Sequence, residues 1–261
     1  MTTILSITRT LVAGLVAGVI LLPFGVLAVL SVGRAWPYPA VLPDVAGLGA
    51  WGLLFSTERG LAGAFGLSVG LALGVAVLAT ALGFVTSRAV AYHPRRDRLL
   101  RLAYGPFVLS PVVYAACLHP FFIRLGLSGG VAGVGLGQLL IAYPFAVIFF
   151  TGFWNDNIRS LENVVLTLGG SPGQALRWVL LPLARNLLGV CFFQTFLISW
   201  FEYGLTAFIS VGRVQTLPVK VYGYIGEANP FLAALSSCLL VFPPLVLLWA
   251  NKRILYREVG R

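Results

Sequence analysis

Four polar side chains recur at helical spacing inside an otherwise apolar stretch of the chain. Thr195, Ser199, Glu202 and Thr206 are separated by 4, 3 and 4 residues, and Tyr203 is next to the carboxylate. On a continuous helix this spacing places the four on one face. A carboxylate in hydrocarbon costs about 3 kcal/mol, so Glu202 should face a bundle interior or a watery cavity. We predict that these five residues line a path for a polar solute. The alternatives are a carboxylate that bonds a neighbouring helix or one that reaches water at the outer end.

A second stretch, Ser160–Leu183, combines two short helical segments with a tight turn. Four apolar residues at helical spacing predict that the first segment is amphipathic, namely Leu161, Val164, Val165 and Leu168. Gly169 and Gly170 should end this helix, and Ser171 with Pro172 should begin a second one that ends at Leu181–Pro182. A helix this short is not stable alone in water. Its apolar face therefore needs a partner, either the membrane surface or a groove of a soluble protein.

The composition predicts the elements that position these residues. Of the 261 residues, 59% are hydrophobic and 10% are charged, whereas a soluble domain has about a quarter of its residues charged. We therefore predict an all-α integral membrane protein with about six transmembrane helices, each of about 20 residues. The predicted spans are Leu11–Val32, Leu61–Val85, Leu102–Ile123, Val131–Phe153, Leu187–Ile209 and Phe231–Trp249. Residues 1–261 should form a single transmembrane domain, with a loop of about residues 154–185 between helices four and five.

The distribution of cationic residues predicts the orientation of these spans. Only five of the 18 Lys and Arg residues lie on the predicted outer side, namely Arg34, Arg59, Arg124, Arg213 and Lys220. The other 13, with a cluster between Arg88 and Arg101, lie on the opposite side. Both termini and the Ser160–Leu183 loop are therefore predicted to be cytoplasmic.

Several function classes do not fit the sequence. The net charge of +10 could suggest nucleic-acid binding, but the charges lie at the ends of apolar spans and not on a basic, aromatic surface. A phosphate-binding P-loop needs Gly-Lys before Ser or Thr, and the two lysines, Lys220 and Lys252, follow Val219 and Asn251. No ligand spacing for zinc or haem and no GxSxG motif is present. We expect neither an enzyme nor a nucleic-acid binder, and no cofactor or metal held by this chain.

The Ser160–Leu183 loop resembles the cytoplasmic EAA signature of permease subunits in binding-protein-dependent type I ABC importers. That signature reads Leu-Glu-x-Ala-Ala-x-x-Leu-Gly-Ala-Ser and later Leu-Pro. The matching positions here are Glu162, Leu168, Gly169, Ser171, Leu181 and Pro182, while Val164 and Val165 replace the two alanines and Asn163 the second acid.

The stretch Ser199–Leu240 also resembles a part of these proteins. It looks like the last third of polyamine, ferric-iron and thiamine-type permeases, with an acidic–aromatic pair followed by Thr216-Leu217-Pro218. The resemblance implies a permease subunit that forms the solute path and couples to a separate ATPase through residues 160–183.

The resemblance also implies roles and partners. The expected ATPase-coupling residues are Leu161, Glu162, Val165, Leu168 and Gly169. Glu162 would orient the loop, Gly169 would permit its turn, and the apolar residues would contact the ATPase. The expected partners are two copies of an ATP-binding subunit that holds ATP and Mg, a second permease subunit (identical or homologous) and an external or periplasmic solute-binding protein. The expected location is the bacterial inner cell membrane, within the lipid bilayer.

The substrate and the transport class leave alternatives. One intramembrane acid favours a small hydrophilic, cationic solute such as a polyamine, and ferric iron, thiamine-like cations and aminophosphonates stay open. In polyamine-type permeases a second acid often follows the first, and Tyr203 stands there in this chain. A stand-alone secondary transporter or channel that uses Glu202 as its ion or proton site is the alternative function. A membrane scaffold is a third possibility.

Overall fold

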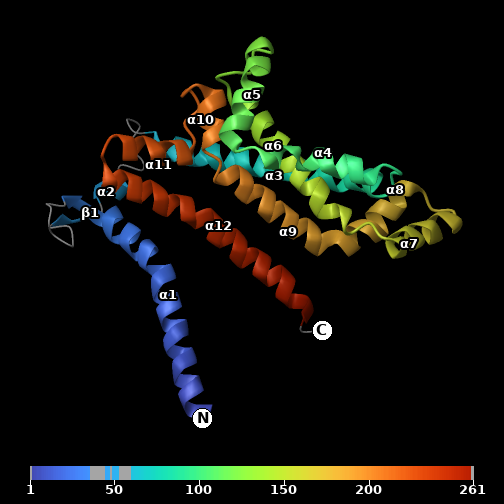
Figure 1. Ribbon diagram of the computed structural model, residues 1–261, viewed down its shortest axis with the longest axis horizontal. Coiled ribbons are helices and arrows are strands. Elements are labelled where there is room, and N and C mark those ends of the chain that lie inside the picture. The colour runs from blue at the N-terminus through green and yellow to red at the C-terminus, as the bar shows by residue number, and fades with distance from the viewer. Residues whose placement is uncertain (1, 36–44, 48, 53–59, 260–261) are drawn as a thin grey trace. The chain divides into compact units, whose positions relative to one another are not determined.

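The computed structural model describes residues 2–35, 45–47, 49–52 and 60–259, and nearly all of them are helical (Figure 1). The first part contains α1 (Thr2–Val32), the antiparallel strands β1 (Gly33–Ala35) and β2 (Val45–Ala46), and α2 (Gly49–Gly52). The middle part contains α3 (Leu61–Ala91), α4 (Arg96–Val108), α5 (Pro111–Arg124), α6 (Val131–Thr151), α7 (Asp156–Thr167) and α8 (Pro172–Ala175). A π-helical turn, η2 (Leu176–Leu180), leads into α9 (Leu181–Trp200), followed by α10 (Gly204–Ser210), α11 (Leu217–Gly226) and α12 (Pro230–Val259).

The number of membrane-length helices agrees with the sequence prediction. Among the described residues, five apolar helices are long enough to cross a membrane, and a bent pair, α4 with α5, makes a sixth if it counts as one span. The five helices cover Val12–Val32, Leu61–Ala91, Val131–Thr151, Pro172–Trp200 and Pro230–Trp249. The all-α, multi-pass fold class is therefore confirmed.

The third predicted span, Leu102–Ile123, is not one straight helix. Helices α4 and α5 meet at an angle of 102° around Ser110 and Pro111. Proline disfavours helical backbone at the residue before it and lacks an N–H to donate. Pro111 therefore begins α5, and the Ser110 hydroxyl caps the new helix by accepting from the Val113 N–H at 3.4 Å. The predicted span Leu102–Ile123 is thus made of two helices that are joined at a sharp bend.

The fifth predicted span, Leu187–Ile209, also needs correction at both ends. The short helix that begins at Ser171–Pro172 was predicted to end at Leu181–Pro182. It does not end there, because α8, η2 and α9 follow one another without a gap. Pro182 lies at the start of α9, and the wider π-turn before it is closed by the Leu181 N–H, which donates to the Leu176 carbonyl. The break comes after Trp200 instead, so Glu202 lies between α9 and α10 and not within one helix.

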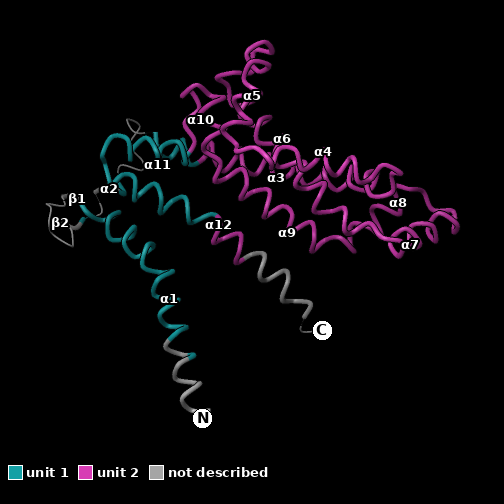
Figure 2. Tube along the Cα trace, viewed as in Figure 1, with its two compact units in different colours: residues 1–65, 217–243 teal, residues 66–216, 244–261 magenta. Residues whose placement is uncertain are grey.

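By its internal contacts, the chain divides into two compact units (Figure 2). Unit 1 comprises residues 1–65 and 217–243, and unit 2 comprises residues 66–216 and 244–261. All ten predicted site residues belong to unit 2. Within this unit, α7 and α8 lie at one end of the long helices, and α5 and α10 lie towards the other (Figure 1).

Helix α6 is the central helix of unit 2 and packs against α4, α9 and α10. One core cluster joins α3 and α6 to the base of the α7 loop through Phe84, Phe150, Trp154 and Leu180. Gly83 permits the close approach of α3 and α6, because a Cβ atom there would lie 2.4 Å from the Ala146 Cβ. Buried aromatic contacts of this kind make the base of the loop a rigid platform.

Candidate functional site

The first candidate site is the loop that contains α7 and α8. The Asn155 side chain begins α7 by accepting from the Ile158 N–H at 3.0 Å, so the helix starts five residues before Leu161. At its other end the Gly169 N–H donates to the Leu166 carbonyl, and the Gly170 N–H donates to the Val165 carbonyl. Gly169 has φ +85°, as expected for the glycine that closes a helix in this way. The predicted helix end at Gly169 is confirmed.

The second short helix begins as the sequence predicted. The Ser171 hydroxyl accepts from the Gln174 N–H at 3.2 Å, and the Gln174 side chain accepts from the Ser171 N–H at 2.7 Å. Together with Pro172 at the first helical position, these bonds form a complete capping box. The turn between α7 and α8 is therefore held from both sides by local hydrogen bonds.

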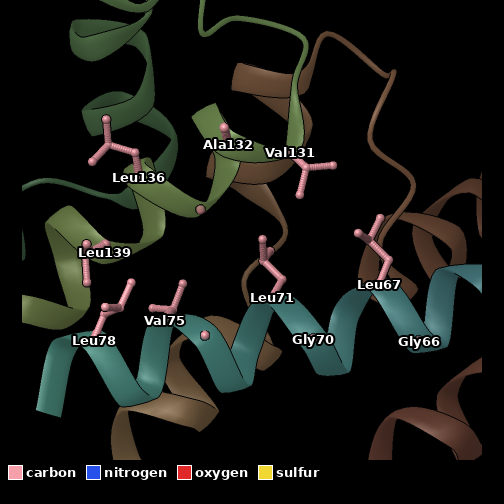
Figure 3. A pocket seen from close by; sticks show the side chains of 12 residues that line it. Gly66, Leu67, Gly70, Leu71, Val75, Leu78, Val131, Ala132, Leu136 and Leu139 are labelled. Carbon is pink, nitrogen blue, oxygen red and sulfur yellow. The ribbon is translucent and has the colours of Figure 1, made fainter. Parts of the chain in front are cut away.

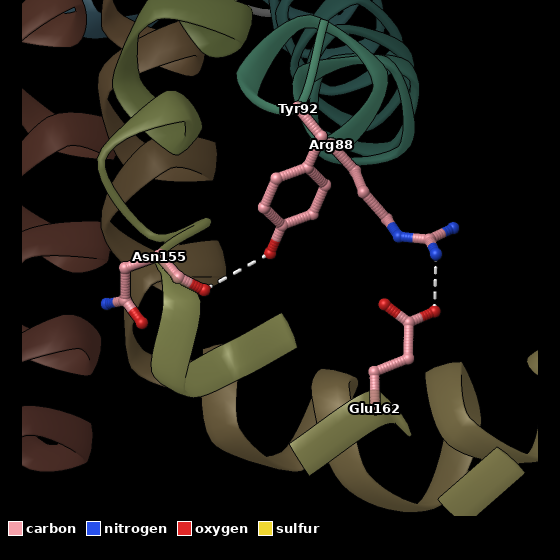
Figure 4. A network of polar contacts seen from close by, with 4 residues as sticks. All are labelled: Arg88, Tyr92, Asn155 and Glu162. Atoms are coloured by element: carbon pink, nitrogen blue, oxygen red, sulfur yellow. Dashed lines mark hydrogen bonds and ion pairs between the residues drawn. The ribbon is translucent and has the colours of Figure 1, made fainter. Parts of the chain in front are cut away.

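Glu162 joins α7 to the end of α3 (Figure 4). Its carboxylate forms an ion pair with Arg88, and its side chain is 4% exposed, compared with 45% for that of Arg88. The sequence analysis had assigned Arg88 only to the basic cluster that determines orientation. Its role as the partner of Glu162 was missed, because 74 residues separate the two and no local pattern links them.

Further polar contacts hold the same end of α3. The Tyr92 hydroxyl donates to the Asn155 carbonyl at 3.2 Å (Figure 4), and the Trp154 indole N–H donates to the Ser87 hydroxyl at 2.7 Å. Burial, and then the nearby Glu162 carboxylate, raises the pKa of Tyr92, so its hydroxyl remains a donor at neutral pH. Helix α7 is therefore anchored to α3 through its beginning and through Glu162.

Three apolar residues along α7 and at its C-terminal end are exposed. Leu161, Val164 and Leu168 are 44%, 54% and 82% exposed, respectively. Val165, which the sequence analysis placed on the contact face, is half-buried, and Ile158 and Glu162 are buried on the inner side. A cavity of about 220 Å³ lies beneath the loop, lined in part by Arg88, Glu162 and Leu176. The loop thus offers an apolar ridge on a firmly held base.

The second candidate site connects α6, α9 and α10 through buried polar side chains. The Ser199 hydroxyl donates to the Gln138 Oε1 at 2.6 Å, and the Gln138 Nε2 donates to the Thr206 hydroxyl at 2.9 Å. The Thr206 hydroxyl in turn donates to the Glu202 Oε2 at 3.0 Å. Three of the five predicted residues are therefore joined, and Gln138 bridges them. The sequence signal for this bridge is a glutamine within the apolar helix α6, since polar residues in membrane helices often form hydrogen bonds to neighbouring helices.

A fourth predicted residue, Thr195, contacts a different helix. The Thr195 hydroxyl, on α9, lies 3.2 Å from that of Thr80 on α3 and donates to the Cys191 carbonyl at 2.8 Å. Tyr203 is half-buried and immediately precedes α10. The Thr195 hydroxyl therefore contacts α3 and its own helix.

The Glu202 carboxylate caps α10. It accepts from the Leu205 N–H and the Thr206 N–H, each at 2.9 Å. Both are among the first N–H groups of a helix, which have no partner within it, and the positive end of the helix dipole favours a negative charge there. The half-buried carboxylate is thus stabilised by two backbone N–H groups.

An apolar groove lies elsewhere in unit 2, between α3 and α6 (Figure 3). It has a volume of about 640 Å³, and Gly66, Gly70 and Gly74 lie along its α3 side. A Cβ atom at any of the three would meet nothing within 4 Å. A side chain at any of these positions would therefore extend into open space.

Several known proteins resemble the chain. The spermidine/putrescine transport system permease protein PotC of Escherichia coli is 28% identical over 210 residues, 78% of each chain. The trehalose transport system permease protein SugB of Mycobacterium tuberculosis is 26% identical over 62% of this chain and 60% of its own. A probable molybdenum ABC transporter permease of Haloferax volcanii is 32% identical over 49% and 50%, respectively. No family profile matches the chain.

A solved structure confirms the fold. It is a bacterial ABC transporter involved in the import of the acidic polysaccharide alginate, with a TM-score of 0.65, 16% identity and 96% of both chains covered. The resemblance to ABC importer permeases that the sequence predicted is thus confirmed by the named relatives.

Proposed function

We propose that this chain is the permease subunit of an ABC importer for a small hydrophilic solute, and that α7 couples it to a separate ATPase. The observation that carries this proposal is the Arg88–Glu162 ion pair, which holds an amphipathic helix with its apolar side outward. An apolar ridge of Leu161, Val164 and Leu168 suits a groove of a soluble partner. Relatives named as transport-system permeases support the same reading.

The proposed coupling is mechanical. A force applied to α7 reaches α3 through the Arg88–Glu162 pair and the Tyr92–Asn155 bond, and reaches α9 because η2 and α9 are continuous. Elements packed this tightly move as rigid bodies. Closure of an ATPase dimer would therefore tilt the long helices of unit 2 and change access to the solute path.

The proposed solute path includes the network of Ser199, Gln138, Thr206 and Glu202. These groups can replace the hydrogen bonds between them with hydrogen bonds to a polar solute. The replacement costs little free energy, because each group is hydrogen-bonded with and without the solute. A polyamine is the first candidate, since the relatives include permeases named for spermidine and putrescine. Other relatives are named for trehalose and molybdenum, so the network alone does not select a cation.

The remaining components are supplied by partners. In this proposal, two ATP-binding subunits hold ATP and Mg, a second permease subunit completes the path, and an external binding protein delivers the solute. The α7 loop and both termini face the cytoplasm of a bacterial cell, as the charge distribution predicts.

Uptake by proteoliposomes tests this function. The chain is reconstituted with its co-purifying partners, and uptake of labelled spermidine is measured under two conditions. The first supplies ATP on the cytoplasmic side of the chain, and the second supplies a proton or sodium gradient without ATP. The proposal predicts uptake that needs ATP and a binding protein. Uptake driven by an ion gradient, without a co-purifying ATPase, would instead identify a secondary transporter centred on Glu202.

A further inference from the structure

A basic cleft of about 380 Å³ lies at the beginning of α4 and is separate from both candidate sites. It is lined by Pro94, Arg95, Asp97, Arg98 and Arg101. Its three arginines are exposed, and in the described part of the chain none of them forms an ion pair. With one carboxylate against three guanidinium groups, and with exposed Arg96 beside them, the cleft is strongly cationic.

Local structure brings these cations together. Arg95, Arg98 and Arg101 are three residues apart, so they follow one side of the first helical turns. The backbone N–H of Arg95 donates to the His93 Nδ1 at 2.9 Å, which fixes the turn before the helix. The Arg101 Nε donates to the Asp97 carbonyl at 3.3 Å and draws that side chain back towards the first turn. The N-terminus of the helix adds its own positive potential.

The same helix becomes apolar directly after the cleft. Leu102 follows Arg98 by one helical turn and is 75% exposed, and Val108 at the end of α4 is 81% exposed. A surface that is cationic at one end and apolar along the next turns matches a phospholipid, whose phosphate and acyl chains are joined in the same order. A soluble anion or an acidic protein would use only the cationic end.

We propose that Arg95, Arg98 and Arg101 bind the phosphate of an anionic phospholipid, with its acyl chains along Leu102 and Val108. Each cation near a membrane surface strengthens binding of anionic lipid about fivefold. Removal of all three should therefore weaken binding on the order of a hundredfold. This inference does not rest on the proposed transport function.

Lipid titration of the purified full chain tests the site. Thermal unfolding in detergent is followed as phosphatidylglycerol or phosphatidylcholine is added, and bound lipid is counted by native mass spectrometry. We expect phosphatidylglycerol alone to bind and stabilise the wild type, and the triple variant Arg95→Gln, Arg98→Gln, Arg101→Gln to lose this response. The triple Arg→Lys variant should retain most of it, and Arg124→Gln, which removes an exposed arginine at the end of α5, should behave as the wild type.

Other outcomes would overturn the proposal. An unchanged response to phosphatidylglycerol in the triple Gln variant, or an equal response to phosphatidylcholine, excludes the site. The same stabilisation by inorganic phosphate or glycerophosphoglycerol at matched concentration would identify a site for a soluble anion. Loss of a co-purifying ATP-binding protein with unchanged lipid affinity would identify a protein-docking surface.

Discussion

Glu162 on α7 is paired with Arg88 at the end of α3, and the carboxylate is buried while the guanidinium is half-exposed. The pair therefore has two unequal members. Water can solvate Arg88 if its partner is removed, but Glu162 would be left as a buried, unpaired charge. Because of this asymmetry, replacing Arg88 and replacing Glu162 should have effects of different size.

Arg88→Ala is expected to loosen α7 more than Glu162→Ala does. An uncompensated buried carboxylate costs about 1–3 kcal/mol, whereas the loss of a half-exposed cation's partner costs less. Hydrogen exchange of the α7 backbone amides measures the local free energy of opening. Arg124→Ala serves as the control for removing an arginine, and equal protection of α7 in Arg88→Ala and Glu162→Ala would contradict the assigned burial.

Gly169→Val should disrupt the turn after α7, and Gly169→Asn should be tolerated. A Cβ atom there meets nothing within 4 Å, so the penalty comes from φ +85° and not from a clash. Left-handed backbone costs most residues about 1–2 kcal/mol, while Asn adopts it readily. Solute-stimulated ATPase activity of the reconstituted complex is the measurement. Gly152→Ala, at a right-handed position with open space, is the matched control.

Leu168→Asp should prevent capture of the ATP-binding subunit without unfolding the chain, because Leu168 is 82% exposed. Its apolar contact would be replaced by a charge that must be desolvated on docking. Asn163→Asp introduces the same charge at an exposed position of α7 outside the ridge and should leave capture intact. Co-purification of the ATPase with each variant decides the matter, and equal capture by both would place the contact elsewhere.

Gln138→Leu should lower uptake about tenfold. It removes the side chain that bridges buried Ser199 and Thr206, and the loss of these buried hydrogen bonds costs about 1–3 kcal/mol. ATPase capture should be unaffected, since Gln138 lies far along α6 from the α7 loop. Gln194→Leu changes an exposed glutamine of α9 and is expected to behave as the wild type. Normal uptake by Gln138→Leu would remove the network from the path.

Two roles of Glu202, capping α10 and attracting a cationic solute, can be separated by substitution. Glu202→Ala removes the acceptor for the Leu205 and Thr206 N–H groups and should lower thermal stability by about 1 kcal/mol. Glu202→Gln keeps one acceptor oxygen and should retain most of that stability, yet lower uptake of a cationic solute. If Glu202→Gln transports as well as the wild type, the carboxylate serves only as a cap.

Features set by neighbouring residues could be predicted from the sequence. The helix end at Gly169 and the start at Ser171–Pro172 depend on hydrogen bonds that reach only a few residues along the chain, and both were correct. The helix breaks were harder to place. Pro182 resembled a helix end, but the π-helical turn η2 precedes it and the helical run continues through it. Glu202, in contrast, draws the first N–H groups of α10 to its side chain, and the helix breaks there.

Long-range pairs could not be predicted in this way. Both Arg88 and Gln138 were visible as polar residues at the ends or in the middle of apolar spans, but their partners lie on other helices. The partner depends on how α3, α6, α7 and α9 pack, and helix periodicity contains no information about that packing. Leu168 and Glu162 illustrate the same limit. The spacing of apolar residues predicted one apolar face on α7, but the packing of the loop left Leu168 exposed and buried Glu162.

ATP hydrolysis by the reconstituted complex, on addition of solute-loaded binding protein, tests the central claim most directly. The variants are Arg88→Glu, Glu162→Arg and the two combined, which reverses the ion pair. We predict that each single variant loses the stimulation and that the reversed pair restores part of it, since the contact between α3 and α7 is regained. Full stimulation in both single variants would show that the Arg88–Glu162 pair does not hold the coupling helix.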